Sequence, residues 1–173
     1  MSLKGKKVLM FVEDGYEDLE FWYPKIRLIE EGAEVVVASK NKGVFNSKRG
    51  YQANVKVRVE TLDSKEFDCL IIPGGVVCPD RLRRHKEVLS FVKSMNDQGK
   101  IIASICHGPW VLISAGIVKG KKMTSYYSIK DDIENAGAEY LDRSVVVDGN
   151  VITSRRPDDL PNFCKAIIKA LKG

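Results

Sequence analysis

The sequence predicts an α/β domain in which a mostly parallel β-sheet carries helices on both faces. Short apolar runs alternate along the chain with longer amphipathic runs, an order typical of α/β folds. The apolar runs are rich in β-branched residues, as expected of strands buried on both faces. The predicted strands are residues 7–12, 34–39, 69–75, 100–106 and 144–153.

Helical spacing or capping signals mark the segments between these strands. Residues 17–31 repeat apolar side chains at helical spacing and end at Gly32, a residue typical of a C-cap. Pro24 is expected to bend this helix or to remove one backbone hydrogen bond. Pro157 and the two aspartates after it suit a first helical turn. The other predicted helices are residues 86–98, 107–116, 127–136 and 158–171.

One segment departs from the alternation of strand and helix. Residues 42–59 alternate apolar and polar side chains around Gly50, which predicts a β-hairpin or a small antiparallel insertion. The "VDGN" stretch at 147–150 predicts a second turn that joins two short strands. Repeats and linker-like stretches are absent from the sequence, so we expect a single domain over residues 1–173.

Composition narrows the classes of function. The chain has 173 residues and a net charge of +5, but acidic residues lie among the basic ones, so no nucleic-acid partner is expected. The sequence has no apolar stretch of membrane-spanning length and no secretory signal, which predicts a cytoplasmic protein without a membrane partner. The four cysteines are too widely spaced for a zinc motif, so we expect no metal and no cofactor.

Chemically distinctive residues follow three of the predicted strands. Glu13 and Glu17 follow the first strand, Gly74 and Gly75 end the third, and Cys106 ends the fourth. The carboxyl ends of parallel strands meet at one edge of a sheet, where ligands bind in open α/β folds. This convergence predicts an active site at that edge.

Cys106 is the candidate nucleophile of this site. It lies at a predicted strand-to-helix turn between the small residues Ser104 and Gly108, as in a nucleophile elbow. Free backbone N–H groups of the following helix are expected to lower the pKa of the thiol. The N–H groups of Gly75 and His107 are candidates for an oxyanion hole. The residues alone support a buried structural thiol equally well.

Five stretches of the sequence resemble the PfpI intracellular protease family, which belongs to the superfamily of parkinsonism-associated deglycases and class I glutamine amidotransferase-like domains. They are "EDGYEDLEFWYP", "LIIPGG", "ASICHGPWVLISAGIVKGKKMTSY", "IKDDIENAGAEYLD" and "VVVDGNVITSRRPDDL". The resemblance runs from Val8 to about Leu171. It implies a flavodoxin-like three-layer sandwich formed by one PfpI-like domain.

The resemblance also assigns roles to site residues. It implies that Cys106 is the nucleophile and that Glu17 lies beside the sulfur, sharing a proton with it. A carboxyl group in that place has its pKa raised by burial and by the thiolate. His107 is implied to be the general base or acid. Tyr126 matches a family tyrosine near the mouth of the pocket, which makes it a candidate substrate contact.

The resemblance further implies a homo-oligomer in which an acidic residue of a neighbouring subunit orients His107. The matching position after "PGG" is Asp80, an aspartate where the family has a glutamate one methylene longer. The structural alternative for Asp80 is the N-cap of a helix that begins near Arg81.

Three functions remain open at this point. The first is a cofactor-independent enzyme of the glyoxalase or deglycase type, which acts on a small reactive carbonyl through a hemithioacetal on Cys106. The second is an intracellular cysteine peptidase or amidase with a peptide substrate. The third is a redox-sensing or chaperone-like stress protein without turnover. The sequence has no histidine after His107, which excludes the glutamine amidotransferase arrangement.

Overall fold

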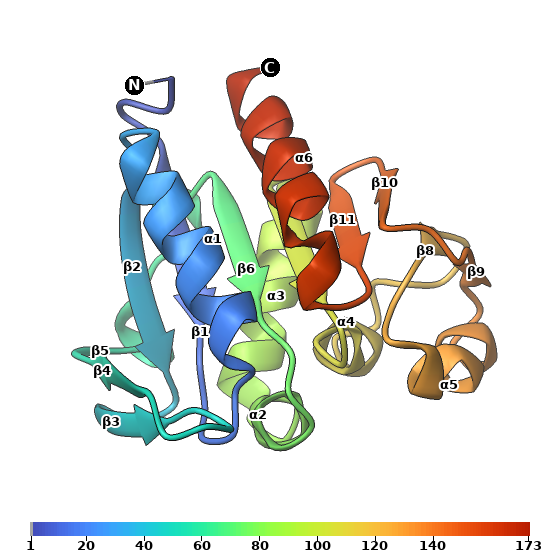
Figure 1. Ribbon diagram of the computed structural model, residues 1–173, viewed down its shortest axis with the longest axis horizontal. Helices are drawn as coiled ribbons and strands as arrows, with labels where there is room; N and C mark the ends of the chain where they lie inside the picture. Colours follow the sequence, from blue (N-terminus) through green and yellow to red (C-terminus); the bar gives the residue numbers. More distant parts are fainter. Residues whose placement is uncertain (1) are drawn as a thin grey trace.

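A seven-stranded sheet forms the centre of the molecule in a computed structural model, which describes residues 2–173. The strand order is β10-β11-β7-β6-β1-β2-β5 (Figure 1). Every neighbouring pair is parallel except β10 and β11. The strands are β1 (Lys7–Phe11), β2 (Glu34–Ser39), β5 (Val57–Arg58), β6 (Cys69–Ile72), β7 (Ile101–Ile105), β10 (Val145–Asp148) and β11 (Val151–Ser154).

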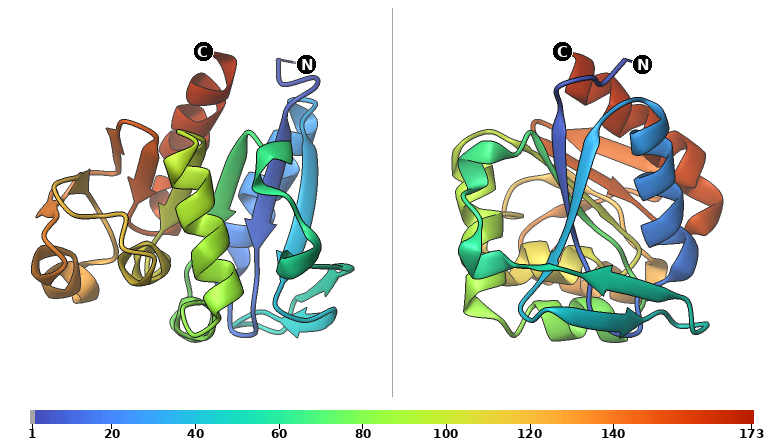
Figure 2. Two further views of the ribbon diagram at one scale, coloured as in Figure 1. Left: turned by 180° about the vertical axis from the view of Figure 1, so that it is seen from behind. Right: turned by 90° about the vertical axis from the view of Figure 1, so that its left-hand side faces the viewer.

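Helices cover both faces of this sheet. Helices α1 and α6 pack together on one face, and α3 packs on the other with α4 beside it (Figure 2). The three layers confirm the predicted flavodoxin-like α/β sandwich. The helices are α1 (Asp18–Glu30), α2 (Val77–Leu82), α3 (Lys86–Asp97), α4 (Pro109–Ser114), α5 (Lys130–Asn135) and α6 (Leu160–Lys172).

Burial follows the apolar pattern of the sequence. All four residues of β6 and the last four of β1 are buried, as expected of central strands covered on both faces. On α1 the buried face contains Phe21, Pro24 and Leu28, and Pro24 lies inside the helix. No helix within residues 2–173 is both long and apolar enough to span a bilayer.

The insertion at residues 42–59 is confirmed in part as a hairpin. Strand β3 (Gly43–Asn46) pairs antiparallel with β4 (Gln52–Val55), whereas β5 leaves this unit and joins β2 in the main sheet. The predicted turn at 147–150 is confirmed, because β10 and β11 pair antiparallel across Gly149. The parallel pair β8 (Lys122–Met123) and β9 (Glu139–Tyr140) was not predicted, and α2 was expected only as the alternative helix that begins near Arg81.

Candidate active site

Cys106 lies on a strained turn between β7 and α4. Its φ of 63° makes it the one non-glycine residue with positive φ among residues 2–173. Such a conformation costs roughly 1–3 kcal/mol and persists only where neighbours hold it. The N–H of Cys106 donates to the carbonyl of Ser154 at 3.0 Å, and its own carbonyl accepts from the N–H of Tyr126 at 2.9 Å. The predicted elbow at Cys106 is therefore present, with a side chain that is 7% exposed.

His107 contacts the sulfur directly because of this turn. Its Nδ1 lies 3.2 Å from Sγ of Cys106, and its Nε2 lies 3.1 Å from the hydroxyl of Ser128. Tyr126 stacks on the imidazole with ring centroids 5.1 Å apart, and Trp110 meets it edge-on at the same distance. Burial, with the positive charge of Lys48 as the second cause, lowers the pKa of His107. A neutral imidazole is the form that can take a proton from the thiol.

Glu20 supplies a buried carboxyl group beside the sulfur. Its Oε2 accepts from the N–H of Gly74 at 2.8 Å, whereas Oε1 has no nitrogen or oxygen partner in the part of the chain described. Burial, followed by the charge of Glu17, raises the pKa of Glu20 to about 8. The carboxyl is therefore mostly protonated at neutral pH, and its O–H can donate to the neighbouring sulfur of Cys106.

Glu17 does not lie at the position expected for it. It is the N-cap of α1, where Oε2 accepts from the N–H of Glu20 at 2.9 Å, and its side chain is partly exposed. The expectation that Glu17 contacts the sulfur is wrong because its carboxylate caps the first turn of α1, whereas Glu20, three residues later, lies on the buried face of the helix. A signal for Glu20 was available in the sequence, since it precedes Pro24 and Leu28 by one and two helical turns on the buried face.

The surroundings of Cys106 raise the pKa of its thiol rather than lower it. The N–H groups of Gly75 and His107 act to lower the pKa of the thiol, in the expected direction, and their role as an oxyanion hole stays a prediction. Burial, however, raises the pKa of Cys106, and a charged Glu20 raises it further. The expected lowering of the thiol pKa is therefore wrong for the resting site. A protonated Glu20 removes the second of these causes and supplies a donor to a thiolate.

Gly75 holds its N–H toward the sulfur in a conformation that only glycine adopts freely. Its φ is +83°, and a Cβ added there would lie 2.3 Å from the carbonyl oxygen of Gly15. We expect Gly75→Ala to lower the free energy of unfolding by roughly 3 kcal/mol or more. Gly50→Ala is the matched control, because its φ is +91° but a Cβ meets nothing within 4 Å. Equal losses for the two variants in urea unfolding would contradict the tight packing inferred at Gly75.

The raised pKa of Glu20 predicts how stability depends on pH. Between pH 4.5 and about 8 the folded protein holds a proton on Glu20 that the unfolded chain has released. Stability therefore falls as pH rises through this window, by at most roughly 5 kcal/mol. We expect Glu20→Gln to flatten this part of the profile in urea titrations. Glu17→Gln removes the second cause of the raised pKa, so it should keep the fall in stability over a narrower range of pH. An unchanged slope in Glu20→Gln would show that Glu20 is not the titrating group.

Asp80 lies within α2 and forms an ion pair with Arg84. The structural alternative, in which Asp80 caps a helix, is wrong, since α2 begins at Val77. Within residues 2–173 it makes no hydrogen bond to His107, whose Nε2 contacts Ser128 instead. The approach of Asp80 to His107 from a neighbouring subunit stays a prediction, as does the homo-oligomer. Sequence reasoning missed Glu20 and Ser128.

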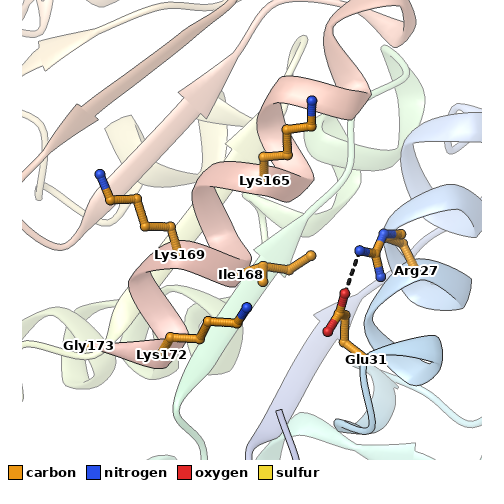
Figure 3. Close-up of a pocket in the computed structure, with 7 residues that line it drawn as sticks. All are labelled: Arg27, Glu31, Lys165, Ile168, Lys169, Lys172 and Gly173. Carbon is orange, nitrogen blue, oxygen red and sulfur yellow. Dashed lines mark hydrogen bonds and ion pairs between the residues drawn. The ribbon is translucent and has the colours of Figure 1, made fainter. Parts of the chain in front are cut away.

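Two hollows help to locate the site on the molecule. One of about 410 Å³ lies between α1 and α6, away from Cys106, and is lined chiefly by lysines and the Arg27–Glu31 ion pair (Figure 3). The other, of about 290 Å³, adjoins the elbow, because it is lined by Tyr126, which stacks on His107. Among residues 2–173, no three His, Cys, Asp or Glu side chains lie close enough together to hold a metal ion.

Comparisons with known proteins agree with this architecture. The family model described as the DJ-1/PfpI family matches residues 6–170. The protein named deglycase TK1284, from Thermococcus kodakarensis, is 48% identical over 166 residues, which cover 96% of this chain and 99% of the relative. The protein/nucleic acid deglycase 2 of Escherichia coli is 38% identical over 171 residues, covering 96% and 98% of the two chains. The crystal structure of Drosophila melanogaster DJ-1beta is 33% identical with a TM-score of 0.91, over 97% of this chain and 91% of that one. With a match across nearly its whole length, the chain belongs to the DJ-1/PfpI family.

Proposed function

We propose that this protein is a cysteine enzyme that acts on reactive carbonyls, of the deglycase or glyoxalase type, and that it needs no cofactor. The observation that carries the proposal is the buried carboxyl of Glu20 beside the strained Cys106, with the imidazole of His107 3.2 Å from the sulfur. Relatives named deglycases support the same class of substrate. A thiol between an acid and a base suits addition to an aldehyde.

The first step is addition of the thiol to the aldehyde of a 2-oxoaldehyde. A bond forms between Sγ of Cys106 and the aldehyde carbon, and the thiol proton passes to Nδ1 of His107. The electron pair of the C=O bond moves to its oxygen, which takes the proton of Glu20. The N–H groups of Gly75 and His107 face the sulfur and can stabilise charge that develops beside it.

The second step converts the hemithioacetal into a thioester of the 2-hydroxy acid. The carboxylate of Glu20 removes the proton from the sulfur-bearing carbon and returns it to the adjacent carbon, while His107 relays the hydroxyl proton between the two oxygens. Water then adds to the thioester, and the C–S bond breaks. The sulfur recovers its proton from His107, and Glu20 recovers its own from the water. The net reaction adds one water to the oxoaldehyde and needs no oxidant.

Formation of lactate from methylglyoxal tests this proposal. Reduced wild-type protein, in the presence of a chelator and without glutathione, is expected to produce lactate that proton NMR can follow over time. Absence of lactate from fully reduced, folded protein would overturn the proposal. Heat-denatured protein is the control for reactions of free thiols and amines.

A cysteine peptidase or amidase is the second candidate, and the distance between Sγ and Nδ1 is the observation that favours it. Acyl transfer also needs an acid that orients His107. In the described chain that position is taken by the hydroxyl of Ser128. Release of nitroaniline from a peptide anilide, with no lactate from methylglyoxal, would favour this second function.

A further inference from the structure

The hollow of about 290 Å³ beside the elbow is lined mainly by tyrosines and arginines, and we call it the tyrosine hollow. Its lining residues are Ser125, Tyr126, Tyr127, Tyr140, Asp142, Arg155 and Arg156. Two contacts place it next to the reacting sulfur. Tyr126 stacks on His107, and the arginines directly follow Ser154, whose carbonyl accepts from the N–H of Cys106. A group attached to a carbonyl at Cys106 can therefore extend into it.

The aromatic side chains make this hollow suitable for a planar group. The rings of Tyr126 and Tyr127 lie 4.7 Å apart between centroids, and Tyr127 is 73% exposed. Tyr140 is held nearby, because its hydroxyl donates to the carbonyl of Ser125 at 3.4 Å. An exposed tyrosine ring next to a site offers a stacking surface for another aromatic ring.

Arg156 is the arginine of the tyrosine hollow that can pair with a negatively charged ligand. Arg155 forms ion pairs with Asp142 at 2.6 Å and with Asp159 at 2.9 Å. The first of these pairs also neutralises the charge of Asp142. Arg156 has one ion pair among residues 2–173, a contact of 3.6 Å with Asp158, whose side chain is 86% exposed. Exposed pairs of this kind contribute little free energy, so a ligand carboxylate can replace Asp158.

We propose that the tyrosine hollow is a subsite for the group that the reactive carbonyl carries, and that it selects a planar aromatic group bearing a negative charge. Tyr127 is the stacking residue, and Arg156 is the specificity-determining residue for charge. The proposal rests on the proposed function, because it takes Cys106 as the place where the carbonyl binds. It adds to that function the class of substrate: an acidic arylglyoxal or a similar adduct, preferred over methylglyoxal.

Equilibrium binding of three product analogues tests this subsite by calorimetry. The ligands are lactate, mandelate and 4-carboxymandelate, which add first a ring and then a charge to the same hydroxy acid. We expect the wild type to bind mandelate about fivefold more tightly than lactate, because the ring stacks. We expect 4-carboxymandelate to bind up to about fivefold more tightly still, because an exposed ion pair is worth at most that much.

Three variants separate the two contributions. Tyr127→Leu is expected to bring mandelate within twofold of lactate, and Arg156→Gln to bring 4-carboxymandelate within twofold of mandelate. Lys169→Gln removes the same charge on α6, at the distant hollow of Figure 3, and should keep both wild-type ratios.

Equal affinities for the three ligands, no binding of any of them, or the same ratios in Arg156→Gln and Lys169→Gln would each overturn the subsite. Because binding of these acids needs no turnover, a failure to convert methylglyoxal would count against the proposed function alone.

Discussion

Glu20→Gln is expected to lower kcat/KM for methylglyoxal by about 10²- to 10⁴-fold, the range typical for loss of a general acid or base. Glutamine keeps the shape of the side chain and an acceptor for the N–H of Gly74, but it can neither give nor take a proton. Because burial raises the pKa of Glu20 to about 8, wild-type activity that needs the protonated acid should decline above that pH.

Glu17→Gln is the matched control for this variant. The residue lies three positions earlier and caps α1 with its side chain, so it transfers no proton in the proposed reaction, and losing its charge acts only through the pKa of Glu20, which that charge helps to raise. We expect its kcat/KM to stay within about fivefold of wild type, since a weakened cap costs only about 1 kcal/mol of stability. A larger loss in Glu17→Gln than in Glu20→Gln would contradict the arrangement described here.

Cys106→Ala is expected to abolish turnover, with a fall in kcat/KM of about 10⁴-fold or more, because no other group in the site can form the covalent intermediate. Cys164→Ala removes a buried thiol from α6 and should retain wild-type turnover at a small cost in stability. Initial rates of lactate formation compare the two variants. Activity that survives in Cys106→Ala but fails in Cys164→Ala would place the nucleophile elsewhere.

The sequence predicted the layers of the fold well because burial and periodicity are local signals. Strand β2 was predicted with its observed bounds, and α1 and α3 to within one residue at each end. The short elements were missed for the same reason. Strands β8 and β9 have two residues each, which is too few for a period to be recognised, and α2 was expected to begin near Arg81 rather than at Val77.

Only the site residues that directly follow a strand could be predicted from the sequence. The positions of Cys106, His107 and Gly75 follow from the turn after β7 and the loop after β6, and the structure brings all three together. Glu17 was assigned from the resemblance alone, and the burial that distinguishes Glu20 from it depends on which face of α1 packs on the sheet. Ser128 belongs to a segment distant in sequence from the elbow, so its contact with His107 needed the tertiary structure.

Covalent catalysis by Cys106 is tested most directly by carbon-13 NMR of Glu20→Gln with methylglyoxal labelled at the aldehyde carbon. This variant is expected to form the bond to Sγ of Cys106, with water supplying the proton that Glu20 gives in the wild type, but it lacks the base for the later transfer between carbons, so a hemithioacetal signal accumulates on the protein. The same signal should be absent from Glu20→Gln combined with Cys106→Ala. A protein-bound signal that persists in the double variant, or its absence from Glu20→Gln while the wild type makes lactate, would contradict covalent catalysis by Cys106.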